Sequence, residues 1–143
     1  MTEGLSTRAS VAIEAPIGEV WEALTTPELI KRWFFGVDTD SDWTVGSPIV
    51  HRGEYLGKPY EDKGEILVME PPRRLVHTHW SPVSGIPDSP ESYQRVSWEL
   101  SERAGGTELT VRETNLPSDE AKGTSDQTWP LVLGNLKRLL EGG

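Results

Sequence analysis

Two histidines come closer to a chemical site than any other residues of this sequence. His77 and His79 are two positions apart within residues 74–81, which are expected to form a strand, so both rings point to the same face of the sheet. Such a pair can chelate zinc when further ligands are present, and His51 and Glu65 are the candidates. Because no HExxH motif or Cys/His spacing accompanies the pair, we interpret it as polar residues that line a cavity or a solvated sheet face.

An imidazole group titrates near neutral pH and can act as a general base. His77 or His79 could therefore serve a cyclase- or hydrolase-like enzyme. The sequence contains no GxSxG motif, no glycine-rich phosphate loop and no cysteine, so the common nucleophilic and phosphate-binding sites are missing. We predict no catalytic residue, and an enzyme is kept as an alternative to a binding protein.

The acidic stretch at residues 38–42 resembles the start of a calcium loop, because aspartate occupies every second position. A calcium loop also needs a glycine and a glutamate further along, and Trp43 and Ile49 stand at those positions. A solvated edge strand explains the same residues, since charge protects an exposed edge from pairing. We therefore predict neither a metal ion nor another cofactor.

Aromatic side chains are the most useful remaining indication of a site. The chain has six tryptophans, and large aromatic rings bury much area each. The aromatic residues come from the region of the second expected helix, from strands and from the last helix: Trp33, Phe34, Phe35, Trp43, Trp80, Trp98 and Trp129. Most should pack in the core. Some should line a cavity, because small-molecule sites combine apolar walls with a few polar groups.

The elements that must position these residues begin with a strand and two short helices. Residues 6–14 alternate as a strand that ends before Pro16, which suits the start of a helix and cannot donate to a ladder. Apolar residues at helical spacing then predict helices over 17–25 and 27–34. Thr26 and Pro27 are expected to begin the second helix.

Strands follow over most of the remaining chain. Alternation and turn residues predict them near 49–55, 61–70, 74–81 and 93–101, with a return strand after Gly105 and Gly106 and an extended stretch after Gly36. On the strand 93–101, Val96, Trp98 and Leu100 should share one face. Three prolines and a glycine predict a loop over 81–91.

A long amphipathic helix is expected at the C-terminal end, where leucines recur at three- and four-residue spacing up to Leu140. Proline is unfavourable inside a helix and tolerated in its first turn. Because of Pro130, we expect regular helix only from about Thr128. The polar residues before it should form an irregular rim segment. This helix is the only element long enough to cover the apolar face of the sheet.

Composition excludes several classes of partner. The 143 residues should form one domain, 1–143. A net charge of −9 and the lack of any basic run argue against nucleic acid and against an anionic membrane surface. No secretory signal or transmembrane run is recognised, so we expect a cytoplasmic protein that is a monomer or homodimer.

Several separated segments resemble the START-like (SRPBCC) superfamily, and within it the AHSA1-like branch, which includes the C-terminal domain of the Hsp90 ATPase activator. The segments are residues 11–33, 64–75, 96–100, 106–111 and 129–139. The resemblance implies an α+β helix-grip fold. In that fold a curved antiparallel sheet of about six to seven strands wraps on a long C-terminal helix, with two short helices after the first strand.

The family is one of binding cavities, so the resemblance implies that a small apolar or amphipathic ligand binds between the C-terminal helix and the sheet. We expect this binding without catalysis. The residues expected to line the site are Trp33, Phe35, Met69, His77, His79, Trp98, Trp129 and Leu133. The family's name implies a second function, a chaperone accessory that acts with Hsp90.

Overall fold

A computed structural model describes residues 5–82 and 85–142 of the chain. Its elements are β1 (Leu5–Ile13), α1 (Ile17–Thr25), α2 (Pro27–Trp33), β2 (Asp38–Ser41), β3 (Pro48–Tyr55), β4 (Lys58–Glu70), β5 (Arg74–His79), η2 (Pro90–Ser92), β6 (Gln94–Arg103), β7 (Gly106–Leu116) and α3 (Asp119–Leu140). The strands form one antiparallel, seven-stranded sheet in the order β1-β7-β6-β5-β4-β3-β2. The loop expected over 81–91 includes residues 83 and 84, which lie outside the described ranges.

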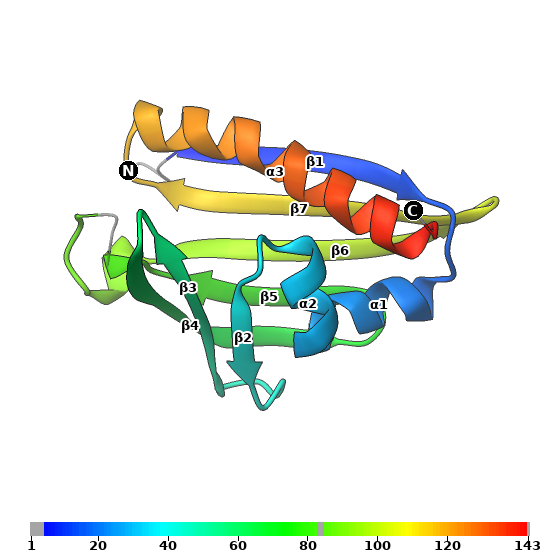
Figure 1. Ribbon diagram of the computed structural model, residues 1–143, viewed down its shortest axis with the longest axis horizontal. Coiled ribbons are helices and arrows are strands. Elements are labelled where there is room, and N and C mark those ends of the chain that lie inside the picture. Colours follow the sequence, from blue (N-terminus) through cyan, green and yellow to red (C-terminus); the bar gives the residue numbers. More distant parts are fainter. Residues whose placement is uncertain (1–4, 83–84, 143) are drawn as a thin grey trace.

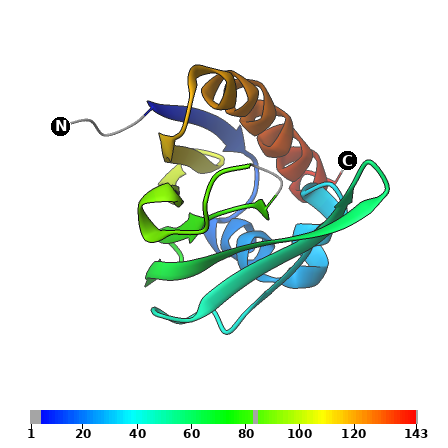
Figure 2. The ribbon, with the colours of Figure 1, turned by 90° about the vertical axis from the view of Figure 1, so that its left-hand side faces the viewer.

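All three helices lie on one face of the sheet. α3 runs along β1, and α1 and α2 lie near the C-terminal half of α3 (Figure 1). Seen from the side, the sheet curves around the helices (Figure 2). This is the helix-grip arrangement, and the predicted fold class is confirmed.

The two short helices form where the sequence predicts them. Pro16 has extended backbone angles (φ −61°, ψ 150°) and directly precedes α1. Thr26 is also extended, and Pro27 occupies the first turn of α2, where its missing N–H has no helical partner to lose. The indole Nε1 of Trp33 donates to the carbonyl oxygen of Ala23 at 2.8 Å, which fixes α2 against α1 and points the Trp33 ring toward the core.

The expected start of the last helix is wrong. α3 is regular from Asp119, nine residues before Thr128, and Pro130 lies inside it. The Ser118 side chain caps the helix by accepting from the N–H of Ala121 at 3.1 Å. Pro130 is exposed, so the carbonyl that loses its hydrogen bond can face water, and the helix continues.

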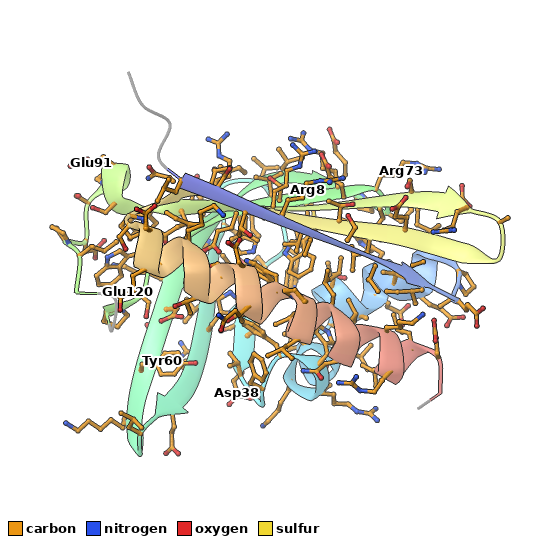
Figure 3. All side chains as sticks on the ribbon, turned by 90° about the horizontal axis from the view of Figure 1, so that it is seen from above. Arg8, Asp38, Tyr60, Arg73, Glu91 and Glu120 are labelled. Atoms are coloured by element: carbon orange, nitrogen blue, oxygen red, sulfur yellow. The ribbon has the colours of Figure 1, made fainter. Side chains whose placement is uncertain are left out.

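The core lies between the helices and the concave face of the sheet. The predicted alternation on β6 is confirmed, since Val96, Trp98 and Leu100 are all buried. Seen from above, side chains fill the space between α3 and the strands, whereas the labelled and exposed Arg8, Arg73 and Glu91 lie outside it (Figure 3). Among the described residues, no helix is long and apolar enough to cross a membrane.

Candidate functional site

A pocket of about 270 Å³ opens between the N-terminal half of α3 and the concave face of the sheet. Residues from α1 and α2, from the loop after β2, and from strands β2, β3, β5, β6 and β7 meet there. Its lining consists of Leu24, Ile30, Trp33, Phe34, Thr39, Trp43, Ile49, His51, Leu75, His77, His79, Val96, Trp98, Glu113, Thr124, Ser125, Thr128 and Trp129.

Three tryptophans form a continuous aromatic wall. The ring centroids of Trp33 and Trp98 are 5.8 Å apart at 73°, and those of Trp98 and Trp129 are 5.5 Å apart at 86°. Edge-to-face pairs of this kind are favourable beyond the area they bury. Because the three rings come from α2, β6 and α3, their contacts hold the wall together across the sheet and both helices.

The three histidines of the chain converge on another part of the lining. His51 lies on β3, and its ring centroid is 6.1 Å from each of those of His77 and His79 on β5. The Nδ1 of His51 shares a hydrogen bond with the Thr39 hydroxyl on β2 at 2.9 Å. The sequence places His77 and His79 on one face, and the register of the sheet adds His51.

Two of these histidines are neutral at pH 7. Burial, helped by the neighbouring His77 and His79, lowers the pKa of His51 to about 3. Burial also lowers the pKa of His77 to about 4, against an opposing hydrogen bond to the Thr78 carbonyl. That carbonyl lies 2.9 Å from His77 Nδ1 and can only accept, so Nδ1 carries the proton and Nε2 keeps a free lone pair.

His79 is oriented by a carboxylate. Its Nε2 donates to Asp62 Oδ2 at 3.0 Å, and Asp62 pairs across the strands with His51. The second carboxylate oxygen, Asp62 Oδ1, is buried and makes no hydrogen bond within the described ranges. Because the carboxylate can only accept, Nε2 carries a proton, and the other ring nitrogen, Nδ1, is the one left to exchange a proton with a bound molecule.

Glu113 on β7 joins the sheet to the N-terminal half of α3. Its Oε1 accepts hydrogen bonds from the Ser125 hydroxyl at 2.8 Å and from the Trp129 indole N–H at 3.0 Å. The Glu113 side chain lies inside the pocket and the residue is only 8% exposed. Glu113 therefore brings a carboxylate to the edge of the tryptophan wall.

The eight residues expected to line the site separate into two groups. Trp33, His77, His79, Trp98 and Trp129 line the pocket. The other three do not. Phe35 is 60% exposed and its backbone is left-handed (φ 53°). Met69 is half-buried against the core, and Leu133 is buried within the core.

Sequence reasoning missed several lining residues, and two of them carried a usable signal. Glu113 has the same parity as Leu109 and Val111 on its strand, so strand alternation assigns it to the buried face. His51 shares the face of Ile49 in the same way. Asp62, which orients His79, has the same parity as the buried Ile66 on its strand, so alternation assigns it to that face as well; only its meeting with His79 depended on how β4 and β5 approach each other.

The described residues contain no group of three or more His, Asp or Glu side chains placed to hold a metal ion. The His77–His79 pair is close to His51, but each of the three rings already makes a hydrogen bond to another residue of the chain.

The chain matches the model of a known family. The model of the family described as "Activator of Hsp90 ATPase homolog 1-like protein" matches residues 14–141. No curated protein matches the sequence.

Solved structures agree with this match. The solution structure of ChR145 from Cytophaga hutchinsonii is 40% identical, with a TM-score of 0.85, over 99% of this chain and 97% of that one. CalU16 from Micromonospora echinospora is 29% identical, with a TM-score of 0.74, over 92% of this chain and 73% of that one. The Aha1 dimer from Colwellia psychrerythraea is 21% identical, with a TM-score of 0.75, over 96% of both chains, and this likeness concerns the fold alone.

Proposed function

The chain belongs to the family of activator of Hsp90 ATPase homolog 1-like proteins, and on that premise we propose that it binds a small apolar or amphipathic molecule in the pocket under α3. The observation that carries the proposal is the pocket itself, with aromatic walls and a few convergent polar groups. Small-molecule sites generally have this composition.

The size of the pocket limits the ligand. A cavity of about 150 Å³ accommodates benzene, so the 270 Å³ present here suits a body of one or two rings. The residues proposed to contact it are those of the expected set that line the pocket: Trp33, His77, His79, Trp98 and Trp129.

Titration with indole and naphthalene, followed by amide NMR shifts and thermal unfolding, tests the proposal. Both should shift the amides of β5, β6 and the N-terminal half of α3, and both should raise the unfolding temperature.

The matched variants are Thr128→Phe and Gln127→Phe. Thr128 lines the pocket and Gln127 lies on the exposed side of the same helix turn. T128F should abolish binding, because the larger ring occupies the pocket, whereas Q127F should bind as the parent protein does. Saturable shifts that persist in T128F would place the bound molecule elsewhere and remove the proposal.

The Asp62–His79 pair favours a second candidate function, acid–base catalysis in the same pocket. A carboxylate that orients a histidine toward an apolar cavity is the arrangement of a general base. The reaction would be removal of a proton from an activated carbon, with the proton passing to His79 Nδ1.

The elimination of 5-nitrobenzisoxazole reports such a base, because loss of one C–H proton breaks the N–O bond and releases a coloured phenolate. We expect turnover above that of free imidazole, lost in His79→Gln and reduced in Asp62→Asn. Glu61→Gln, an exposed change on the same strand, is the control. A rate equal to that of imidazole in solution would exclude this candidate.

Association with Hsp90 stays a prediction that rests on the family's description. Measurement of the host Hsp90 ATPase rate with and without the protein tests it, and an unchanged rate would remove it.

A further inference from the structure

The pocket contains a negative charge that no positive charge balances. Glu113 is 8% exposed, and among the described residues it forms no salt bridge. Both hydrogen bonds it accepts end on Oε1, so Oε2 receives no donor from the described part of the chain. A buried carboxylate without a counter-charge is costly, and a neutral glutamine would accept the same two bonds at lower cost.

The rest of the lining offers an anion little to bind to. No lysine or arginine among the described residues lines the pocket. Burial holds the pKa values of His51 and His77 at about 3 and about 4, so at neutral pH these rings supply no positive charge. His77 Nε2 instead offers a lone pair, because Nδ1 donates to the Thr78 carbonyl.

The tryptophan wall begins at Glu113. The Trp129 indole donates to the same carboxylate, and its ring contacts that of Trp98, which contacts that of Trp33. Aromatic faces attract cations, most strongly when the site is shielded from water. A cationic group bound at Oε2 would therefore enter a pocket that also holds the indole rings of the wall.

We propose that the pocket selects ligands with a protonated amine on an aromatic or alicyclic body, and that Glu113 receives the amine while the tryptophan wall receives the body. This inference rests on the proposed binding function and adds the chemical class of the ligand. Fatty acids and other carboxylates are excluded by it.

Four compounds that share one ring system test the selection: tryptamine, tryptophol, indole-3-acetate and indole. Calorimetric titration at pH 7 should give the tightest binding for tryptamine, weaker binding for tryptophol and indole, and the weakest for indole-3-acetate. In Glu113→Gln the affinity for tryptamine should fall about tenfold, the usual effect of losing a charged hydrogen bond, whereas that for tryptophol should stay within about twofold.

Glu108→Gln is the matched control, since it removes the same charge from the outer, exposed face of the same strand. It should bind all four compounds as the parent protein does. Thermal unfolding of E113Q verifies that the glutamine keeps the hydrogen bonds to Ser125 and Trp129.

Three results would overturn the inference while the binding function stands. The first is indole-3-acetate binding as tightly as tryptamine, and the second is E113Q weakening tryptamine and tryptophol equally, which is the signature of a structural role. The third is indole binding as tightly as tryptamine. If none of the four compounds binds and naphthalene also fails, the binding function itself is wrong and the inference falls with it.

Discussion

The two halves of α3 are held against the sheet by different interactions. In the C-terminal half, Val132, Leu133 and Leu136 are at most 2% exposed and belong to the core. In the N-terminal half no residue of 119–129 is buried. Hydrogen bonds from Thr7 to Asp126 and from Ser125 and Trp129 to Glu113, with the ring contact of Trp129 on Trp98, make the attachment there. Pro130 lies at the junction.

This contrast places the pocket under the half of the helix that is easier to displace. Local opening draws on regions with few buried apolar contacts, so the N-terminal half should open at a lower free energy than the C-terminal half. A ligand could then enter without disturbing the core. Substitutions in the two halves should therefore have different effects.

The largest effect should come from the C-terminal half. Leu136→Ala should lower the free energy of unfolding by about 2–5 kcal/mol, because it leaves a cavity in a well-packed core. Leu131→Ala is the control, since Leu131 is on the same helix but 62% exposed, and it should cost less than about 0.5 kcal/mol. Equal losses in chemical denaturation would show that the C-terminal half does not anchor the helix.

Low pH should lower the free energy of unfolding through the buried histidines of the pocket wall. His51 and His77 have folded-state pKa values of about 3 and about 4, below the unfolded value of 6.5, so the unfolded chain binds their protons more tightly. Their contribution to stability is full above pH 6.5 and declines as the pH falls toward the folded values. Between pH 7 and pH 5 each should cost about 2 kcal/mol.

Urea unfolding at the two pH values measures this loss. His51→Gln, which cannot be protonated, should lose about half of the difference between pH 7 and pH 5. The carboxylates with lowered pKa values, such as Asp126 and Glu141, contribute only at lower pH, so they leave this window undisturbed. Equal stability at pH 5 and pH 7 would contradict the assignment of neutral, buried histidines.

A smaller effect is expected where α3 begins. Ser118→Ala removes the side-chain cap on the Ala121 N–H and should cost about 1 kcal/mol. Because the N-terminal half opens separately, hydrogen exchange should accelerate for residues 121–126 and change little around Leu136. Ser101→Ala, at an exposed position of β6, is the control. Uniform acceleration along α3 would show that the helix opens as one unit.

The smallest effect has the opposite sign. A Cβ at Gly123 meets nothing within 4 Å, so Gly123→Ala should stabilise the helix by about 0.5–1 kcal/mol through backbone propensity alone. The gain should slow exchange in the N-terminal half only. Gly134→Ala, where a Cβ makes only ordinary contact with Arg138, should slow exchange in the C-terminal half. If both variants slowed exchange in the same residues, the two halves of α3 would not open separately.

Local sequence patterns predicted most of the fold because each pattern acts within a few residues. Pro16 and Pro27 mark helix starts whatever surrounds them, and the alternation on β6 records which face is buried. The predicted start of α3 is wrong because a proline inside a helix is ordinarily destabilising, and Pro130 was therefore expected to lie in the first turn. The destabilisation is smaller when the proline faces water and Ser118 caps the first turn.

The site was predicted less completely, since its residues meet through sheet register and packing. His77 and His79 share a face by spacing alone, but the addition of His51 depended on how β3, β4 and β5 pair. Phe35 and Met69 are aromatic or apolar residues of the expected kind, yet the turn after α2 places Phe35 at the surface and Met69 packs against the core.

By itself, the sequence determined the order of the elements, the faces of the strands and the residue types available to a site, because these depend on neighbours along the chain. Only the tertiary structure decided that Glu113 would meet Ser125 and Trp129 of α3 and that His51 would join the pair on β5. Such contacts join residues far apart in the chain, so they depend on strand register and on the position of α3, which no local pattern encodes.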